Sequence, residues 1–196
     1  MRILAVSDAE ESLLGAQLAN GSIGPFGAVI SCGDLRPGYL DYVSTMANAP
    51  LLYVRGNHDT DEAGYADMGG IPLNCRIEEV GGLRIAGLDG SLLYRDGIVG
   101  YTEREMLLHA ALLAMTAKLT GGVDVLVTHA PPRGYGDMDD IPHRGFECFN
   151  WLLTVLRPRL MLCGHVHLNY GRLDREHAHP TGTRIVNAFG HWEGEL

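Results

Sequence analysis

The chain has 196 residues, a length typical of one domain, and a chain of this size can bury a core without disulfide or metal staples. Hydrophobic residues make up 46% of it and charged residues 20%, and its mean hydropathy is +0.01, which excludes global disorder. No apolar run is long enough to span a membrane, and the strand-like run Ile3 to Val6 follows Met1 too closely for a leader peptide. We therefore expect one domain over residues 1–196, with no membrane contact.

Charge and cysteine content narrow the class of protein further. The chain carries 15 Lys and Arg against 24 Asp and Glu, a net charge of −9, which opposes duplex nucleic acid because that binding needs cations to neutralise phosphates. The cysteines are scattered and form no C-x-x-C pair, which favours reduced thiols and a cytoplasmic protein. They are Cys32, Cys75, Cys148 and Cys163.

The first part of the chain alternates short apolar runs, rich in β-branched residues, with helical patterns. This alternation predicts a β-α-β-α-β beginning. The expected strands cover 2–6, 27–32 and 51–55, and the expected helices cover 10–20 and 38–48.

The rest of the chain begins with a hairpin and then returns to helix and strand. Two strand-like runs, 76–80 and 83–88, are joined by Gly81-Gly82, which predicts a β-hairpin. Thr102 and Glu105 form a capping box that predicts the start of a helix ending near Leu119. The further expected elements are a strand at 123–127, a loop at 130–142, a helix at 143–156, and strands at 160–163, 168–173 and 183–187.

This order of elements predicts the fold class. Strands that alternate with helices and then shift to hairpins favour an α/β sandwich of two mixed sheets covered by helices over one parallel doubly wound sheet. The loop at 130–142 is too short to link two domains, so we interpret it as an active-site loop.

Polar side chains follow the predicted strands, at the point where each strand ends. Because the carboxyl ends of strands meet at one edge of an α/β sheet, we expect these side chains to converge on one ligand. Carboxylates, an amide oxygen and imidazoles suit a hard or borderline divalent cation, and their number suits two cations about 3.5–4 Å apart. The candidates are Asp8, Asp34, Asn57, His58, His129, His165 and His167.

Five blocks occur in this order along the chain: Asp8, Gly33-Asp34, Gly56-Asn57-His58-Asp59, His129 before Ala130-Pro131-Pro132, and Gly164-His165-Val166-His167. Together they resemble the signature motifs of the calcineurin-like metallophosphoesterases, and the resemblance covers nearly the whole chain. It implies a four-layer fold, with two mixed sheets flanked by helices. It also implies hydrolysis of phosphoesters by a hydroxide held between two metal ions.

The resemblance also implies roles for single residues. His58 would be the general acid, since an imidazole can protonate a departing alkoxide near neutral pH. The donor set favours Mn²⁺, with Fe, Zn and Mg²⁺ as alternatives. Asp8 and His167 would hold the first metal, Asp34 would bridge both, and Asn57, His129 and His165 would hold the second.

The sequence departs from the family pattern at two places. The first block usually reads Asp-x-His, whereas here it reads Asp8-Ala9-Glu10, so Glu10 either takes the place of the imidazole as a ligand or lies at a helix N-terminus. The stretch after Asp34 lacks the further Asp that orients the acidic histidine in related phosphoprotein phosphatases. Asp59 is adjacent to His58, but the sequence leaves open whether its carboxylate points toward the His58 imidazole or away from it.

Function and substrate stay open between several alternatives. We expect a small phosphoester substrate and favour a phosphodiester over a phosphomonoester. A non-catalytic binding or scaffold protein with a degenerate metal site is the main alternative, and a nuclease is a weaker one. The candidate phosphate-binding residues are Arg55, Arg133, His143 and Arg144, since a guanidinium can bind a phosphate with two hydrogen bonds.

Overall fold

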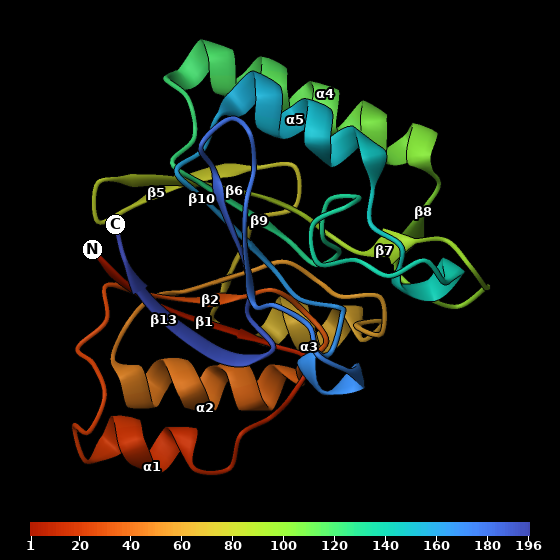
Figure 1. Cartoon of the computed structure of the whole chain (residues 1–196). Coiled ribbons are helices and arrows are strands. Elements are labelled where there is room, and N and C mark those ends of the chain that lie inside the picture. Colours follow the sequence, from red (N-terminus) through yellow and green to blue (C-terminus); the bar gives the residue numbers. More distant parts are fainter.

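The computed structural model describes residues 1–196 and consists of two large mixed sheets packed face to face, with helices on both outer sides (Figure 1). The four-layer α/β fold predicted from the sequence is therefore confirmed. The first sheet has the order β13 (Gly190–Glu195), β1 (Arg2–Ser7), β2 (Ala28–Ser31), β3 (Leu51–Tyr53) and β4 (Ile71–Pro72). The second sheet has the order β11 (Glu176–Ala178), β12 (Arg184–Asn187), β10 (Leu160–Cys163), β9 (Val125–Thr128), β6 (Leu83–Leu88) and β5 (Ile77–Val80).

The helices form the two outer layers, and a short strand pair lies apart from both sheets. α1 (Leu14–Ala19) and α2 (Pro37–Ala47) cover the first sheet. α4 (Glu103–Thr120) and α5 (Glu147–Leu156) cover the second. The remaining elements are α3 (Glu62–Asp67), the pair β7 (Ser91–Leu92) and β8 (Gly100–Tyr101), and the 3-10 turns η1 (Ile141–His143) and η2 (Leu168–Tyr170). No helix combines the length and the apolar character needed to cross a membrane.

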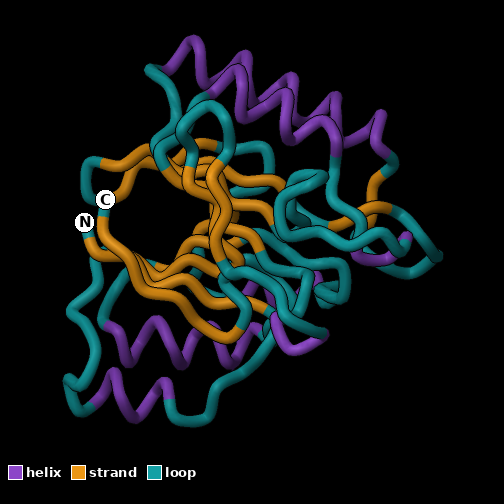
Figure 2. Tube along the Cα trace, in the orientation of Figure 1, coloured by secondary structure: helices purple, strands orange, loops and turns teal.

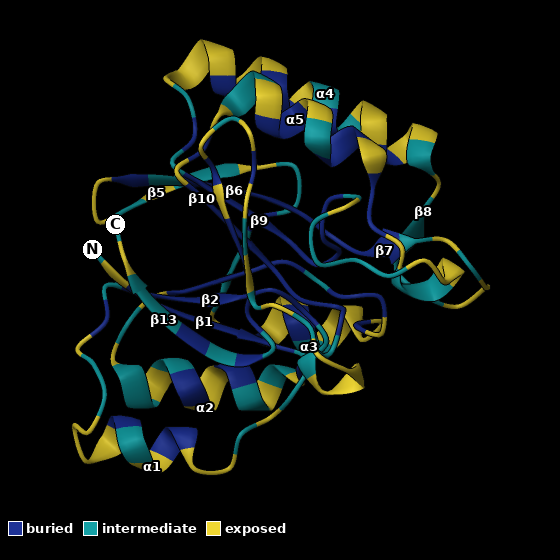
Figure 3. Cartoon of the chain, viewed as in Figure 1, coloured by how far each residue is buried: buried dark blue, intermediate teal, exposed yellow.

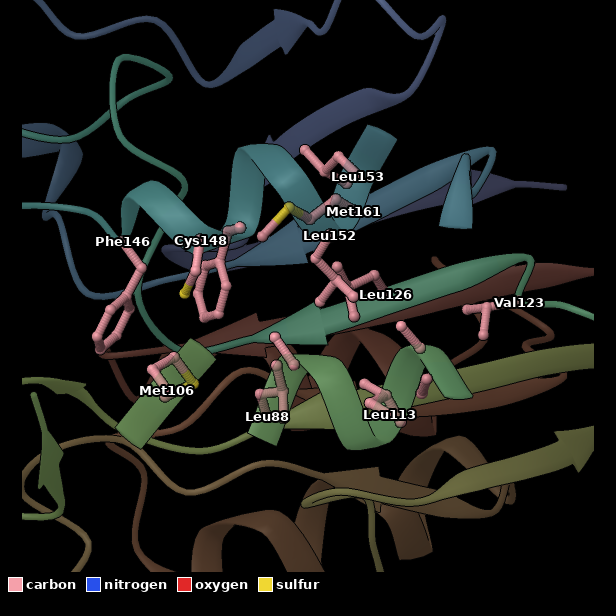
Figure 4. Packing of buried hydrophobic residues seen from close by; sticks show 14 of the residues in the cluster. Leu88, Met106, Leu113, Val123, Leu126, Phe146, Cys148, Leu152, Leu153 and Met161 are labelled. Carbon is pink, nitrogen blue, oxygen red and sulfur yellow. The ribbon is translucent and has the colours of Figure 1, made fainter. Parts of the chain in front are cut away.

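The central strands are buried on both faces, which explains why they read as continuous apolar runs. In β1, Ile3 and Ala5 pack into the core between the two sheets, whereas Leu4 and Val6 pack under α1 and α2. Figure 3 shows the central strands dark blue and the outward faces of the helices yellow. A third cluster lies between the second sheet and α4 and α5, where Phe149 and Met161 are fully buried (Figure 4).

Three predicted elements were wrong in their position. The helix expected at 10–20 begins only at Leu14, because the segment after β1 turns and its Glu11 N–H donates to the Tyr39 hydroxyl. The helix expected at 143–156 begins at Glu147, because Phe146 pairs with Pro132 in a β-bridge. The stretch 168–173 holds the η2 turn instead of a strand, and the strand of this region is β11.

The two chain ends lie side by side at the edge of the first sheet (Figure 2). β13 runs antiparallel to β1, with Glu195 opposite Arg2, and the Met1 amino group donates to the Leu196 carbonyl. The amino end of β1 and the carboxyl end of β13 therefore lie at the same end of the strands of the first sheet. The carboxyl end of β1 lies at the opposite end of these strands.

Candidate metal centre

The carboxyl ends of five strands meet at one edge of the two sheets. β1, β2 and β3 are parallel neighbours in the first sheet, and β9 and β10 are parallel neighbours in the second. Hydrogen bonds join the two sheets there: the His165 N–H donates to Asp8 Oδ2 at 2.9 Å, and His129 Nδ1 lies 2.8 Å from the Cys32 carbonyl. The polar residues that follow these strands are thereby brought together, as the sequence predicts.

Ligand-type atoms converge at this point. Atoms of Asp8, Asp34 and His129 all lie within 4.8 Å of one another. His129 Nε2 also lies 2.9 Å from Asn57 Oδ1 and 3.1 Å from His165 Nδ1. The six residues that the resemblance assigns to two metals thus form one contiguous group, with His167 joined to it by a 3.7 Å distance from its Nε2 to Asp8 Oδ1.

Two observations show that this group fits a cation. Asp8 Oδ1 is buried and has no hydrogen-bond partner, an arrangement that is costly unless a positive charge lies beside it. Asp8, Asp34 and His165 have φ values of 62°, 57° and 70°, a left-handed conformation that is uncommon outside glycine and clusters at functional sites. The chain accepts this backbone strain at three of the converging residues.

The electrostatics of the group point the same way. Burial alone would raise the pKa of Asp34, but the neighbouring His129 and the His58 N–H lower it. Burial would lower the pKa of His129, but Asp34 and Asp8 raise it well above its ordinary value. Burial and the charge of His129 together lower the pKa of His165 to about 4. The paired carboxylates therefore attract one positive charge into a buried site, and a divalent cation can supply that charge.

Asp59 has a different role from the one left open by the sequence. Its Oδ2 accepts hydrogen bonds from the Asp34 and Gly56 N–H groups, both at 2.7 Å, so the carboxylate joins the loops after β2 and β3 and does not orient His58. These loops approach so closely that a Cβ on Gly33 would lie 2.3 Å from the Gly56 nitrogen. His58 is exposed, and its N–H donates to Asp34 Oδ1 at 2.8 Å.

A cavity of about 560 Å³ opens over the group. All predicted metal ligands line it except His129, which is fully buried behind them, and Asp8 has no exposed side-chain surface at the cavity floor. The general-acid candidate His58 lines it as well. Lining residues that the sequence analysis missed include Arg36, Asp61, Tyr94 and Tyr170.

Of the predicted phosphate-binding residues, the structure brings only His143 to the cavity. Arg55 donates to Asp89 at 3.0 Å and faces α3. Arg133 binds Asp137 and the Met138 carbonyl, which fixes the 130–142 loop internally. The Arg144 guanidinium donates to the Asp139 carbonyl. The three arginines therefore hold loops in place.

Glu10 lies in the cavity wall, where its carboxylate forms a two-pronged ion pair with Arg36. It also accepts the Arg36 backbone N–H at 3.3 Å, and Arg36 is the N-cap of α2. Its hydrogen bonds with Arg36 lower the pKa of Glu10. The anion is thus found at a helix N-terminus, but at that of α2 and not of the helix that follows it in the chain. The sequence could have pointed to Arg36 through its spacing, since Arg36 comes two residues after Asp34, as Glu10 comes two residues after Asp8.

The carboxylates and imidazoles at this edge form a candidate metal centre, and comparison with known proteins gives the family of the chain. The calcineurin-like phosphoesterase family model matches residues 20–169. The chain belongs to this family of phosphoester hydrolases, whose members depend on divalent metal ions.

Individual relatives agree with this assignment. The chain is 30% identical over 159 residues to the 3',5'-cyclic adenosine monophosphate phosphodiesterase CpdA of Pseudomonas aeruginosa, covering 79% of this chain and 55% of CpdA. It is 41% identical over 64 residues to human metallophosphoesterase domain-containing protein 1, covering 31% of this chain and 20% of that protein. The alignments with these two relatives thus span 55% or less of the relative's length.

Solved structures with low sequence identity share the fold. The crystal structure of TT1561 of Thermus thermophilus superposes with a TM-score of 0.69 at 16% identity, covering 96% of this chain and 89% of that one. The 5'-nucleotidase precursor from the same organism gives a TM-score of 0.54 at 11% identity and covers 100% of this chain and 51% of that one.

Proposed function

We propose that this protein hydrolyses a small phosphodiester with the help of two divalent metal ions, most readily Mn²⁺. The observation that carries the proposal is the buried, unpartnered Asp8 Oδ1 beside Asp34 and His129, because it leaves a free ligand atom within a group of ligand-type atoms that a cation would satisfy. The likeness to CpdA, a phosphodiesterase by name, supports a diester over a monoester.

The chain's own residues would divide the work as follows. Bound divalent ions would supply Lewis acidity and neutralise charge on the phosphoryl oxygens. Asp8 and His167 would hold one ion, Asp34 would serve both, and Asn57, His129 and His165 would hold the other, as the resemblance implies.

His58 would act as the general acid. Its imidazole is exposed at the cavity, while its backbone is fixed by the hydrogen bond from its N–H to Asp34. A proton on the ring can therefore reach the oxygen of a departing alcohol, which otherwise leaves poorly.

The test is hydrolysis of a nitrophenyl phosphodiester and the matching monoester by metal-stripped protein refilled with Mn²⁺. We expect wild type to cleave the diester faster, and Asn57→Ala to lose at least about a hundredfold in rate. His58→Ala should lose less on these esters, because nitrophenolate leaves without a proton, and should lose most on a diester with an alkyl leaving group. His109→Ala, on α4 and outside the cavity, is the matched control and should keep wild-type activity.

Metal content separates the proposal from its alternative, a non-catalytic binding protein. We expect about two Mn²⁺ per chain in wild type and in His58→Ala, and fewer in Asn57→Ala. A folded wild-type protein that retains less than about one ion and cleaves neither ester would contradict the proposal and favour the binding protein.

A further inference from the structure

Besides histidines and uncharged residues, the cavity over the candidate metal ligands is lined by five carboxylates and one permanently cationic side chain. Arg36 is the only lysine or arginine that lines it. Because a phosphoester is an anion and the chain carries a net charge of −9, a cationic group here has a clear use in binding substrate. The carboxylates in the lining belong to Asp8, Glu10, Asp34, Asp59 and Asp61.

Glu10 holds the Arg36 guanidinium in one orientation. Arg36 Nε donates to Glu10 Oε1 at 2.8 Å, and Arg36 Nη2 donates to Glu10 Oε2. A guanidinium has five N–H donors in a planar fork, and Glu10 takes two of them. The Arg36 side chain is 83% exposed, so its other N–H groups are available to a ligand in the cavity.

The backbone of Arg36 is fixed as well. Arg36 has φ −63° and ψ 140° and precedes Pro37, whose ring restricts the residue before it to this extended region. β1 and β2 are parallel neighbours, so Glu10 and Arg36 leave adjacent strand ends at the same spacing from Asp8 and Asp34. The guanidinium is therefore preorganised beside the candidate metal ligands.

We propose that Glu10 is a positioning residue for Arg36, and that Arg36 binds an anionic group of the substrate that lies outside the reacting phosphoryl group. This inference rests on the proposed function and specifies its substrate class: phosphoesters that carry a second negative charge on the arm that does not react. It also assigns Glu10 to positioning Arg36 and not to metal ligation, since both of its carboxylate oxygens accept from Arg36 and Glu10 is not among the residues whose ligand atoms converge.

The test compares two nitrophenyl phosphodiesters whose other arm is ethyl or carboxyethyl, with Mn²⁺-loaded protein. Arg36→Ala should raise KM for the carboxyethyl ester about tenfold, the worth of one hydrogen bond to a charged group, and leave KM for the ethyl ester and both kcat values close to wild type. Glu10→Ala should raise the same KM by a smaller factor, and Glu10→Gln by less still, because glutamine keeps one acceptor for the guanidinium. In the double variant, KM should equal that of Arg36→Ala alone.

Matched controls come from another two-pronged pair on the surface. Arg184 donates to Glu176 through Nε at 3.0 Å and Nη2 at 2.7 Å, and neither residue lines the cavity. Glu176→Ala and Arg184→Ala should leave both KM values unchanged. Metal analysis should find the same Mn²⁺ content in Glu10→Ala as in wild type.

Two results would overturn the inference. Loss of Mn²⁺ and of kcat in Glu10→Ala, with Arg36→Ala unchanged, would make Glu10 a metal ligand. Equal KM changes for the two esters in Arg36→Ala would show that Arg36 does not bind a second negative charge.

If wild type cleaves neither ester, the proposed function fails, and the inference is then decided by calorimetry that compares the binding of phosphonopropionate with that of propylphosphonate. A preference for phosphonopropionate that Arg36→Ala abolishes supports it, and no preference contradicts it.

Discussion

The loops that follow the central strands differ from the α4–α5 layer in how their carboxylates are used. In the loops, Asp8 and Asp34 hold left-handed backbone, and Asp8 Oδ1 is buried without a partner. In the α4–α5 layer, Thr102 and Glu105 complete a capping box, and the Glu103 carboxylate accepts the first N–H groups of α5. The loops keep a buried carboxylate oxygen without a partner, whereas the carboxylates of the layer satisfy helix N-termini. The layer also holds two buried atoms without a partner, His109 Nδ1 and Asn150 Oδ1.

The difference shows how the stability of the fold and the chemistry of the site are divided between regions. The loops are anchored by strands that are buried on both faces, and the layer adds a fully apolar cluster behind the second sheet. Strain of a few kcal/mol persists only where the surrounding structure determines the backbone. We expect substitutions in the layer to change stability and substitutions in the loops to change metal binding and rate.

The largest effect should come from the core of the layer. Phe149 is fully buried and its ring centroid lies 4.9 Å from that of Phe146. Phe149→Ala should lower the free energy of unfolding by about 3–5 kcal/mol through lost burial and a cavity, measured by urea denaturation. Leu112→Ala, at a position 56% exposed, is the control and should cost far less. Equal costs would show that burial in this cluster does not decide the stability of the layer.

Asp8→Asn should lower activity and metal binding without lowering stability, in contrast to Phe149→Ala. Asparagine has the same shape, tolerates the left-handed conformation, and can still accept the His165 N–H, but it lacks the buried charge. Without metal the melting temperature should stay the same or rise. Activity should fall at least about a hundredfold, and added Mn²⁺ should raise the melting temperature of wild type but not of the variant. A large loss of stability in the metal-free variant would show that Asp8 is structural.

Glu103→Gln tests the link between α4 and α5. The carboxylate accepts the Cys148 N–H at 2.6 Å and the Glu147 N–H at 3.3 Å, next to the positive end of the α5 dipole. Replacing the anion should cost about 1 kcal/mol of unfolding free energy and leave kcat unchanged. Glu79→Gln, at the exposed position of strand β5, is the matched control. A lowered kcat at constant metal content would mean that this helix end communicates with the site.

The smallest effect should be the pH dependence of the α4 cap. The Thr102 N–H and hydroxyl lower the pKa of Glu105 below its ordinary value. Because the folded pKa is lower than the unfolded one, the cap contributes stability above the unfolded pKa and loses it as pH falls through the folded value. The difference in melting temperature between wild type and Glu105→Gln should be present at neutral pH and vanish in acid. A difference that grows in acid would contradict this sign.

Much of the fold could be predicted because its signals are local. The runs at β1, β2, β9 and β10 are apolar on both faces, and the capping box of α4 is explicit in Thr102 and Glu105. β13 was missed because its sequence Gly-His-Trp-Glu-Gly-Glu lacks an apolar run and is held by pairing with β1. α3 was missed because a six-residue helix gives too short a period to detect.

The residues of the candidate site were likewise predictable where local sequence signals fix their position. Asp8, Asp34, His129 and the other strand-end residues were predictable, since strand ends fix their place. The side chains of Arg55, Arg133 and Arg144, which were predicted to bind phosphate, do not line the cavity, because nearby carboxylates and carbonyls bind them. Where a long side chain points depends on partners distant in the sequence, as for Arg36 and Glu10, which lie 26 residues apart.

The side-by-side chain ends make the molecule easy to orient on a support. The ends lie where β1 begins, and the cavity opens where β1 ends, about 20 Å away along a six-residue strand. An affinity tag fused at either end would attach the protein to the support with its cavity facing away from that support. Immobilised and free protein should then show the same KM, which makes surface-based binding assays suitable for screening anionic ligands.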